Sequence, residues 1–222
     1  PIAAPSANRS GKPSPTNAQD VYEDMHGRIP LILDGGACSY GMESTVLSMV
    51  STPTILRPGM VLPEMIAQVT GYVELGENVL RPVEEGAPVL SPGMKYRHYA
   101  PSGRLTMVED DGEGTMAAAV AKLYDVYAAS NKEVLLLATE ENSAFYGKRN
   151  YAIMGSKADV TEICRRFFRL LREADRRGIE EIIVEAVPAH SSGLAFMNRA
   201  LRAAAFRVLF AQDILDQISE GS

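Results

Sequence analysis

The segment APSANRSGKPSPT, residues 4–16, gathers small hydrogen-bonding side chains in a stretch without hydrophobic periodicity. Pro5 and Pro13 restrict its backbone, and Gly11 permits a tight turn. Between and beside them stand four small polar residues: Ser6, Asn8, Ser10 and Ser14. A rigid loop of this kind suits a phosphate or a carboxylate, because small donors approach oxygen atoms closely. A surface turn rich in serine and proline would have the same composition, so both interpretations stay open.

A second group of polar side chains stands where strands are expected to begin or end. In GMESTV, Ser44 and Thr45 follow a glycine-containing turn and precede a run of apolar residues. Hydroxyl groups at strand ends often line ligand clefts in α/β folds, although an ordinary strand start has the same pattern. Arg57 ends the next apolar run, just before a Pro-Gly turn. Its guanidinium could bind a phosphate through two hydrogen bonds, or it could simply be solvated.

The histidines and cysteines do not form a metal-binding or nucleophilic pattern. His26, His98 and His190 lack the spacing of metal ligands, and Cys38 and Cys164 lie far apart without a C-x-x-C motif. The second half of the chain contains neither G-x-G-x-x-G nor G-x-x-x-x-G-K-[ST]. We therefore expect no metal ligands and can name no catalytic residue.

The composition is that of a globular chain. Of its 222 residues, 46% are hydrophobic and 23% are charged, and no apolar run is long enough to span a bilayer. The net charge is −6: residues 1–91 hold 5 Lys and Arg against 10 Asp and Glu, and residues 92–222 hold 17 against 18. The arginine-rich stretch 165–177 is interleaved with acidic residues, so stable binding to RNA is not favoured. We expect a cytoplasmic protein that does not bind a membrane.

Strand and helix patterns divide the chain into two units. In the first, the sequence predicts helices over 18–27 and 62–71, a buried strand over 29–36, and paired strands over 43–50 and 52–59. In the second, continuous apolar strands alternate with helices, which indicates a parallel sheet covered on both faces. Residues 76–103 lack periodicity and read as a linker, but their GMKYRHYAP motif holds more aromatic and basic residues than a spacer needs.

Five segments, taken in their order and spacing, resemble the threonylcarbamoyl-AMP synthase family. They are PIAAPSANRSGKPSPT, LILDGG, ESTV, ILRPG and PGMKYRHYAP, and SSGLAFMNRALRAAA resembles a late helix of the family's second domain. The resemblance, to the two-domain SUA-type members, implies an α/β fold in three parts. These are the C-terminal part of a YrdC-like twisted-sheet catalytic domain (1–75), a linker or lid (76–103) and a small Rossmann-like parallel α/β domain (104–222). It also leads us to expect that the N-terminal part of the catalytic domain precedes this chain.

The family joins L-threonine, bicarbonate and ATP into threonylcarbamoyl-adenylate and releases pyrophosphate, for the modification of adenosine 37 in tRNA by downstream transfer proteins. Mg²⁺ is expected to accompany ATP. Carried over by motif, the resemblance assigns ATP to five residues: Ser6, Asn8, Ser14, Arg57 and Tyr96. It assigns L-threonine to Ala4 and Ser44. The alternatives are an RNA-binding protein or another carbamoyl-transfer enzyme with a YrdC-like domain.

Overall fold

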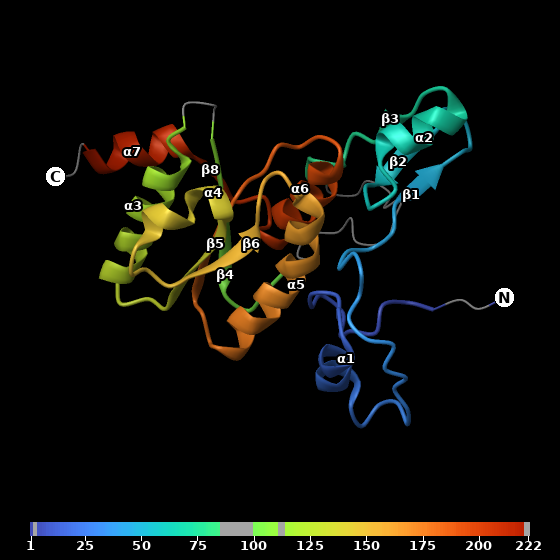
Figure 1. Cartoon of the computed structure of the whole chain (residues 1–222), viewed down its shortest axis with the longest axis horizontal. Coiled ribbons are helices and arrows are strands. Elements are labelled where there is room, and N and C mark those ends of the chain that lie inside the picture. Colours follow the sequence, from blue (N-terminus) through green and yellow to red (C-terminus); the bar gives the residue numbers. More distant parts are fainter. Residues whose placement is uncertain (2–3, 85–99, 111–113, 220–222) are drawn as a thin grey trace.

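A computed structural model describes residues 1, 4–84, 100–110 and 114–219 (Figure 1). Its larger sheet is formed by the second half of the chain and has the order β6-β5-β7-β4-β8. Every neighbouring pair of these strands is parallel, as the continuous apolar runs predicted. The five strands are β4 (Arg104–Glu109), β5 (Val134–Thr139), β6 (Tyr151–Gly155), β7 (Glu181–Glu185) and β8 (Val208–Phe210).

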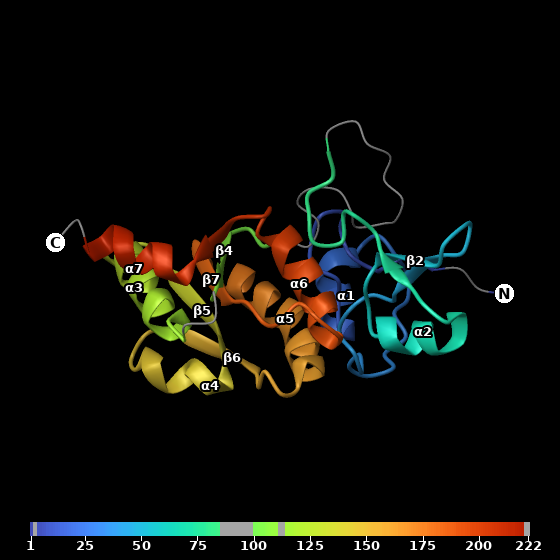
Figure 2. The same ribbon diagram turned by 90° about the horizontal axis from the view of Figure 1, so that it is seen from above.

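Helices cover both faces of this sheet (Figures 1 and 2). The chain moves across the sheet in one direction through α3 and in the opposite direction through α5 and α6. Because such crossovers are right-handed, α3 lies on one face and α5 and α6 lie on the other. The helices are α3 (Met116–Ala129), α5 (Val160–Arg176), α6 (Ser192–Ala203) and α7 (Ala211–Ser219), with α7 packed against α3.

The first part of the chain forms a smaller sheet with the order β1-β2-β3. Strands β1 (Val46–Ser48) and β2 (Thr54–Arg57) are antiparallel, and β3 (Glu74–Leu75) runs parallel to β2. Helix α1 (Ala18–Met25) begins after Asn17, whose side chain accepts a hydrogen bond from the backbone N–H of Asp20. Helix α2 (Pro63–Thr70) has proline in its first turn and ends at Gly71.

The buried strand predicted over residues 29–36 is wrong. These residues have no strand conformation, and Leu31 and Leu33 are exposed. A strand is stabilised by hydrogen bonds to a neighbouring strand, and none of the described strands lies beside this segment. The segment is rich in apolar residues, but it pairs with no strand in the part of the chain that the structure describes.

The sequence also failed to predict several short elements. Strand β6 follows the short α4 (Glu140–Ser143) and a 3₁₀ turn (Ala144–Tyr146), and neither this strand nor these turns was expected. The two turns are too short to show a period of their own. Strand β3, of two residues, was missed for the same reason, whereas α7 was missed although its nine residues exceed the eight of α1.

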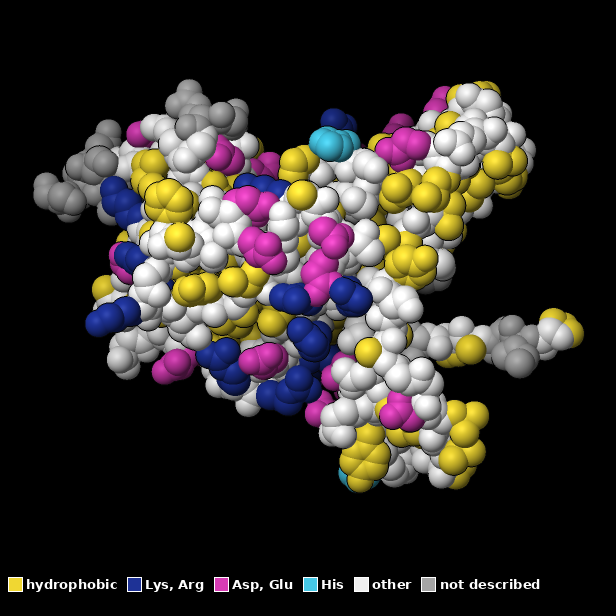
Figure 3. Space-filling view, in the orientation of Figure 1, with side chains coloured by type: hydrophobic (Ala, Val, Ile, Leu, Met, Phe, Trp, Pro, Cys, Tyr) yellow, Lys and Arg dark blue, Asp and Glu magenta, His cyan; other side chains and the backbone are white. Residues whose placement is uncertain are grey.

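Hydrophobic side chains are exposed mainly on the first part of the chain. Figure 3 shows them gathered over the lobe that carries β1, β2 and α2. They include Met49, Val50, Met65, Val69 and Tyr72. In contrast, hydrophobic side chains of the sheet β4–β8 and of its helices form one large buried cluster. Within the described residues, no helix combines the length and the hydrophobicity needed to cross a membrane.

Helix α6 is buried on all its sides. It packs on the larger sheet with one face and contacts the first part of the chain with the other, so even Asn198, Arg199 and Arg202 are at most 2% exposed. A helix that is buried all round normally consists of apolar residues only. The polar side chains of α6 must therefore be hydrogen-bonded, and their partners define the candidate site.

Candidate functional site

A cavity of about 420 Å³ lies between the opening loop and the segment that leads into β1. One wall consists of Ser6 and residues 14–16, and the other consists of residues 38–43. The two walls are joined by a hydrogen bond of 2.8 Å from the backbone N–H of Cys38 to the carbonyl of Thr16. Ser6 and Ser14, the two serines that the family resemblance assigns to ATP, thus line one cavity.

The opening loop is held in shape by its own side chains. The amide nitrogen of Asn8 donates to the carbonyls of Arg9 (2.9 Å) and Lys12 (3.1 Å). Gly11 has a φ of +85°, a conformation that L side chains rarely adopt. The backbone N–H of Thr16 donates to the carboxylate of Asp20 at 3.2 Å, which ties the end of the loop to α1. The loop is therefore an ordered wall of the cavity.

Residues 41–45, which begin in the opposite wall and continue toward β1, make unusually close backbone contacts. A Cβ atom on Gly41 would lie 2.5 Å from the Cα of Arg165 in α5, and one on Gly59 would lie 2.4 Å from the backbone nitrogen of Thr45. Any larger residue at either position would push this wall away from its neighbours. The glycine before ESTV therefore marks the point where the first part of the chain meets α5.

Arg57 and Ser44, assigned to ATP and to L-threonine respectively, lie side by side. Nε and Nη2 of Arg57 donate to the carbonyl oxygen of Ser44 at 3.2 and 3.0 Å. The antiparallel pairing of β1 with β2 places Arg57 opposite Val46 and so brings these residues together. In this structure Arg57 supports the backbone of the cavity wall, and neither residue lines the cavity itself.

Glu43 is the charged group in the cavity wall. One carboxylate oxygen accepts a hydrogen bond of 2.5 Å from the hydroxyl of Ser14, and the other accepts one of 2.9 Å from Nε of Arg199. Burial raises the pKa of Glu43, but the attraction of Arg199 and the hydrogen bonds from Ser14 and Arg199 outweigh it, so this pKa lies below its usual value. Glu43 is therefore ionised at neutral pH.

Helix α5 holds the opening loop and α1 from the other side. Nη2 of Arg172 donates to the carbonyl of Pro13 and to the carboxylate of Asp24. Arg176 forms ion pairs with Asp20 and Glu23 of α1 at 3.5 and 3.1 Å. Two arginines of the stretch that could have faced RNA are thus engaged with carboxylates, which weakens the RNA-binding alternative.

Ala4 is exposed and does not line the cavity. Tyr96 lies outside the described residues together with most of the GMKYRHYAP motif. Both described ends of the linker contact the second domain. Asn78 accepts a hydrogen bond from Arg202, and the backbone N–H of Ser102 donates to Asp175.

Sequence reasoning missed Glu43, Arg172 and Arg199. The available signals were an acidic residue shortly before β1 and the polar residues Asn198, Arg199 and Arg202 inside a largely apolar helix. Because Arg199 and Glu43 are 156 positions apart in sequence, no local pattern could have paired them.

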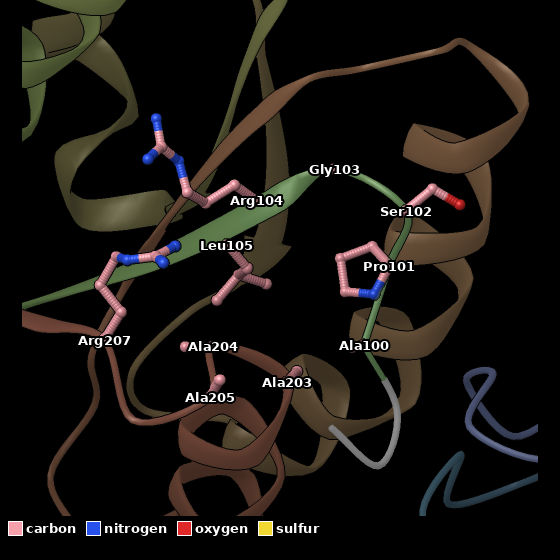
Figure 4. A pocket seen from close by; sticks show the side chains of 10 residues that line it. All are labelled: Ala100, Pro101, Ser102, Gly103, Arg104, Leu105, Ala203, Ala204, Ala205 and Arg207. Atoms are coloured by element: carbon pink, nitrogen blue, oxygen red, sulfur yellow. The ribbon is translucent and has the colours of Figure 1, made fainter. Parts of the chain in front are cut away.

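Another cavity, of about 240 Å³, lies where β4 begins (Figure 4). It is lined by residues 100–105, by the end of α6 and by Arg207. Arg104, on its wall, forms an ion pair with Glu181. None of the residues assigned to ATP or threonine lines this cavity, so we take the one beside Ser14 as the candidate site.

Comparison with known proteins decides the family. A family model described as "Threonylcarbamoyl-AMP synthase, C-terminal domain" matches residues 61–205, and one described as "Telomere recombination" matches residues 1–59. The chain is 39% identical to the threonylcarbamoyl-AMP synthase of Bacillus subtilis over 210 residues, which are 94% of this chain and 58% of the relative. This chain belongs to the threonylcarbamoyl-AMP synthase family.

Further relatives agree with this membership. The Pyrococcus abyssi threonylcarbamoyl-AMP synthase is 39% identical and covers 94% of the chain, and that of Schizosaccharomyces pombe is 36% identical and covers 92%. The solved structure of P. abyssi Sua5 complexed with L-threonine has a TM-score of 0.82 at 37% identity, covering 95% of this chain and 59% of that one. The predicted fold class is confirmed. The chain spans less than three fifths of the length of these relatives.

Proposed function

We propose that this chain contributes to the synthesis of L-threonylcarbamoyl-adenylate from L-threonine, bicarbonate and ATP, with release of pyrophosphate and water. The main support is its likeness, over nearly its whole length, to the P. abyssi protein that was solved with L-threonine. The match of residues 61–205 to the C-terminal domain of the synthases favours this reaction over that of another carbamoyl-transfer enzyme. The product would serve cytoplasmic transfer proteins that modify adenosine 37 of tRNA.

In this proposal, residues 1–75 complete the catalytic domain, residues 76–103 link the domains, and residues 104–222 form the C-terminal domain. Ser6, Asn8 and Ser14 hold ATP on the opening loop, since two of these side chains line the cavity and the third fixes the loop's shape. Ala4 and Ser44 enclose L-threonine. Tyr96 contacts the nucleotide, an assignment that rests on the sequence motif alone.

Mg²⁺ has no dedicated site among the described residues. No group of three or more His, Cys, Asp or Glu side chains there could hold a metal ion, and the carboxylate of Glu43 is already bonded to Ser14 and Arg199. Mg²⁺ is commonly bound through substrate phosphates and water. We propose that it enters with ATP, and we assign no step to it.

Pyrophosphate release by the full-length protein tests the proposed reaction. We expect release from ATP only when L-threonine and bicarbonate are both present, because the adenylate forms only from their carbamate. L-Serine at the same concentration is the control for amino acid specificity. Release that ignores L-threonine would reject the synthase and leave a hydrolase or another transferase.

Arg57→Ala is expected to weaken ATP binding about tenfold or more, the effect of losing a hydrogen bond between charged groups. Because Arg57 also supports the carbonyl of Ser44, we expect a smaller rise in the KM for L-threonine. Arg57→Lys should restore only part of the ATP affinity, since lysine cannot form the two-pronged contact. Separate measurements of the KM for ATP and the KM for L-threonine test whether the effect on ATP is the larger one. A rise confined to L-threonine would show that Arg57 does not bind phosphate.

A further inference from the structure

The carboxylate of Glu43 is placed between two domains. One of its oxygens bonds to Ser14 of the opening loop, and the other bonds to Arg199 of α6, a helix that belongs to the second domain. Glu43 and Ser14 both line the cavity, whereas Arg199 is 0% exposed and does not. An unbroken chain of hydrogen bonds therefore connects the interior of the second domain with a residue assigned to ATP.

Arg199 is itself fixed in one orientation. Its Nη1 donates to the carbonyl of Pro58 at 2.6 Å and to the side-chain oxygen of Asn198 at 2.8 Å. Asn198 in turn donates to the carbonyl of Val79. The planar guanidinium thus meets the carboxylate of Glu43 and the turn after β2 at the same time, which a flexible ammonium group could not do.

This arrangement determines what Ser14 can offer to a ligand. An ionised carboxylate only accepts hydrogen bonds, so the hydroxyl hydrogen of Ser14 is committed to Glu43. Only the lone pairs of the Ser14 oxygen remain available. The group that Ser14 meets in the cavity must then be a donor, such as a hydroxyl or an amino group of the nucleotide, rather than a phosphate oxygen.

We propose that Arg199 is a positioning residue of the second domain, which sets the nucleotide affinity of the cavity by holding Glu43 against Ser14. The inference rests on the proposed binding of ATP at this cavity. It gives the second domain a specific part in the reaction: its helix α6 supplies the group that orders the opening loop.

We call the hydrogen-bonded chain Arg199–Glu43–Ser14 the relay. A double-mutant cycle on the full-length protein tests it. ATP binding is measured by calorimetry without L-threonine for the wild type, Ser14→Ala, Arg199→Gln and the double variant. Each single change is expected to weaken ATP binding about tenfold, the loss of a hydrogen bond to a charged group. The double variant should be no weaker than either single variant, because both changes interrupt one relay. Effects that multiply would overturn the proposal.

Arg202→Gln is the matched control. Arg202 lies on the same helix, is 2% exposed and donates to the carbonyl of Asn78 in the linker. Its replacement removes a buried guanidinium from α6 at another point. We expect any effect of Arg202→Gln to multiply with that of Ser14→Ala.

Hydrogen exchange of the ligand-free protein separates this inference from the proposed function. Arg199→Gln and Glu43→Gln should each accelerate amide exchange in residues 11–16 about tenfold, while Arg202→Gln should not. Glu43→Gln keeps the shape of the side chain, so it serves if Arg199→Gln does not fold. Unchanged protection in these residues would overturn the relay even if the wild type binds ATP. Accelerated exchange in a wild type that binds no ATP would show that Arg199 orders the loop but would overturn its part in nucleotide affinity together with the proposed function.

Discussion

Arg172→Met is expected to lower the free energy of unfolding by about 3–5 kcal/mol, the usual cost of breaking a buried ion pair from one side. Arg172 is 6% exposed, and its guanidinium lies 2.8 Å from Asp24 and also bonds to the carbonyl of Pro13. Without it, the buried carbonyl of Pro13 loses this donor, and among the described residues the carboxylate of Asp24 keeps only the hydrogen bond of 3.3 Å from the backbone N–H of Arg9. Because Pro13 lies in the opening loop and Asp24 lies in α1, these two segments should separate from α5 first.

The change should also alter the response to acid. Burial raises the pKa of Asp24, but the hydrogen bond and charge of Arg172 outweigh it and hold the pKa below the ordinary value of 3.8. Asp24 thus contributes stability that is complete above this ordinary value and is lost as the pH falls through the lower folded pKa. In Arg172→Met this contribution should be smaller, because only the hydrogen bond and charge of Arg9 still lower the pKa of Asp24, so the stability difference from the wild type should shrink in acid.

Urea unfolding at pH 7 and at low pH, with hydrogen exchange over residues 9–26, checks both expectations. Arg169→Met is the matched control, because Arg169 lies one turn earlier in α5 and is exposed. Its replacement should change stability by less than about 0.5 kcal/mol. Equal losses for the two variants would mean that the contacts of Arg172 with the opening loop contribute nothing.

The parallel sheet could be predicted from sequence because its strands are buried on both faces. In β4, for example, all four residues of Leu105–Val108 are buried and three of them are apolar. The 29–36 segment has a similar run but no neighbouring strand. Apolar composition indicates that a segment could be buried, whereas pairing depends on residues elsewhere in the chain.

The residues of the candidate site could likewise be predicted only in part. Ser6 and Ser14 could be predicted because the opening loop concentrates small polar residues between prolines. Glu43 and Arg199 could not be joined, since their contact arises only when α6 packs between the larger sheet and the first part of the chain. Residues that bind a ligand can leave a local pattern, but the residues that position them need the tertiary fold.

A second buried carboxylate stabilises the interior of the C-terminal domain. Glu185, at the end of β7, is 0% exposed and accepts hydrogen bonds from the backbone and hydroxyl of Thr139, from Asn142 and from the hydroxyl of Tyr146. Burial, followed by the charge and hydrogen bond of Glu185, raises the pKa of Tyr146 above its ordinary value, which keeps this donor protonated. Among the described residues, no cation pairs with Glu185, so these four donors alone compensate its burial.

Glu185→Gln is therefore expected to destabilise the domain by about 3 kcal/mol or more, because the new amide group faces donors and leaves buried polar groups unpaired.

Glu109→Gln is the control on the neighbouring strand β4. Glu109 is half-buried, its carboxylate forms no hydrogen bond or ion pair with a described residue, and burial raises its pKa. Removing its charge should leave stability unchanged or slightly increased. Urea unfolding of both variants at pH 7 measures the difference. If Glu185→Gln unfolds at the same urea concentration as Glu109→Gln, the four donors do not need the carboxylate. The packing of β5 against β7 would then alone stabilise the carboxyl ends of these strands.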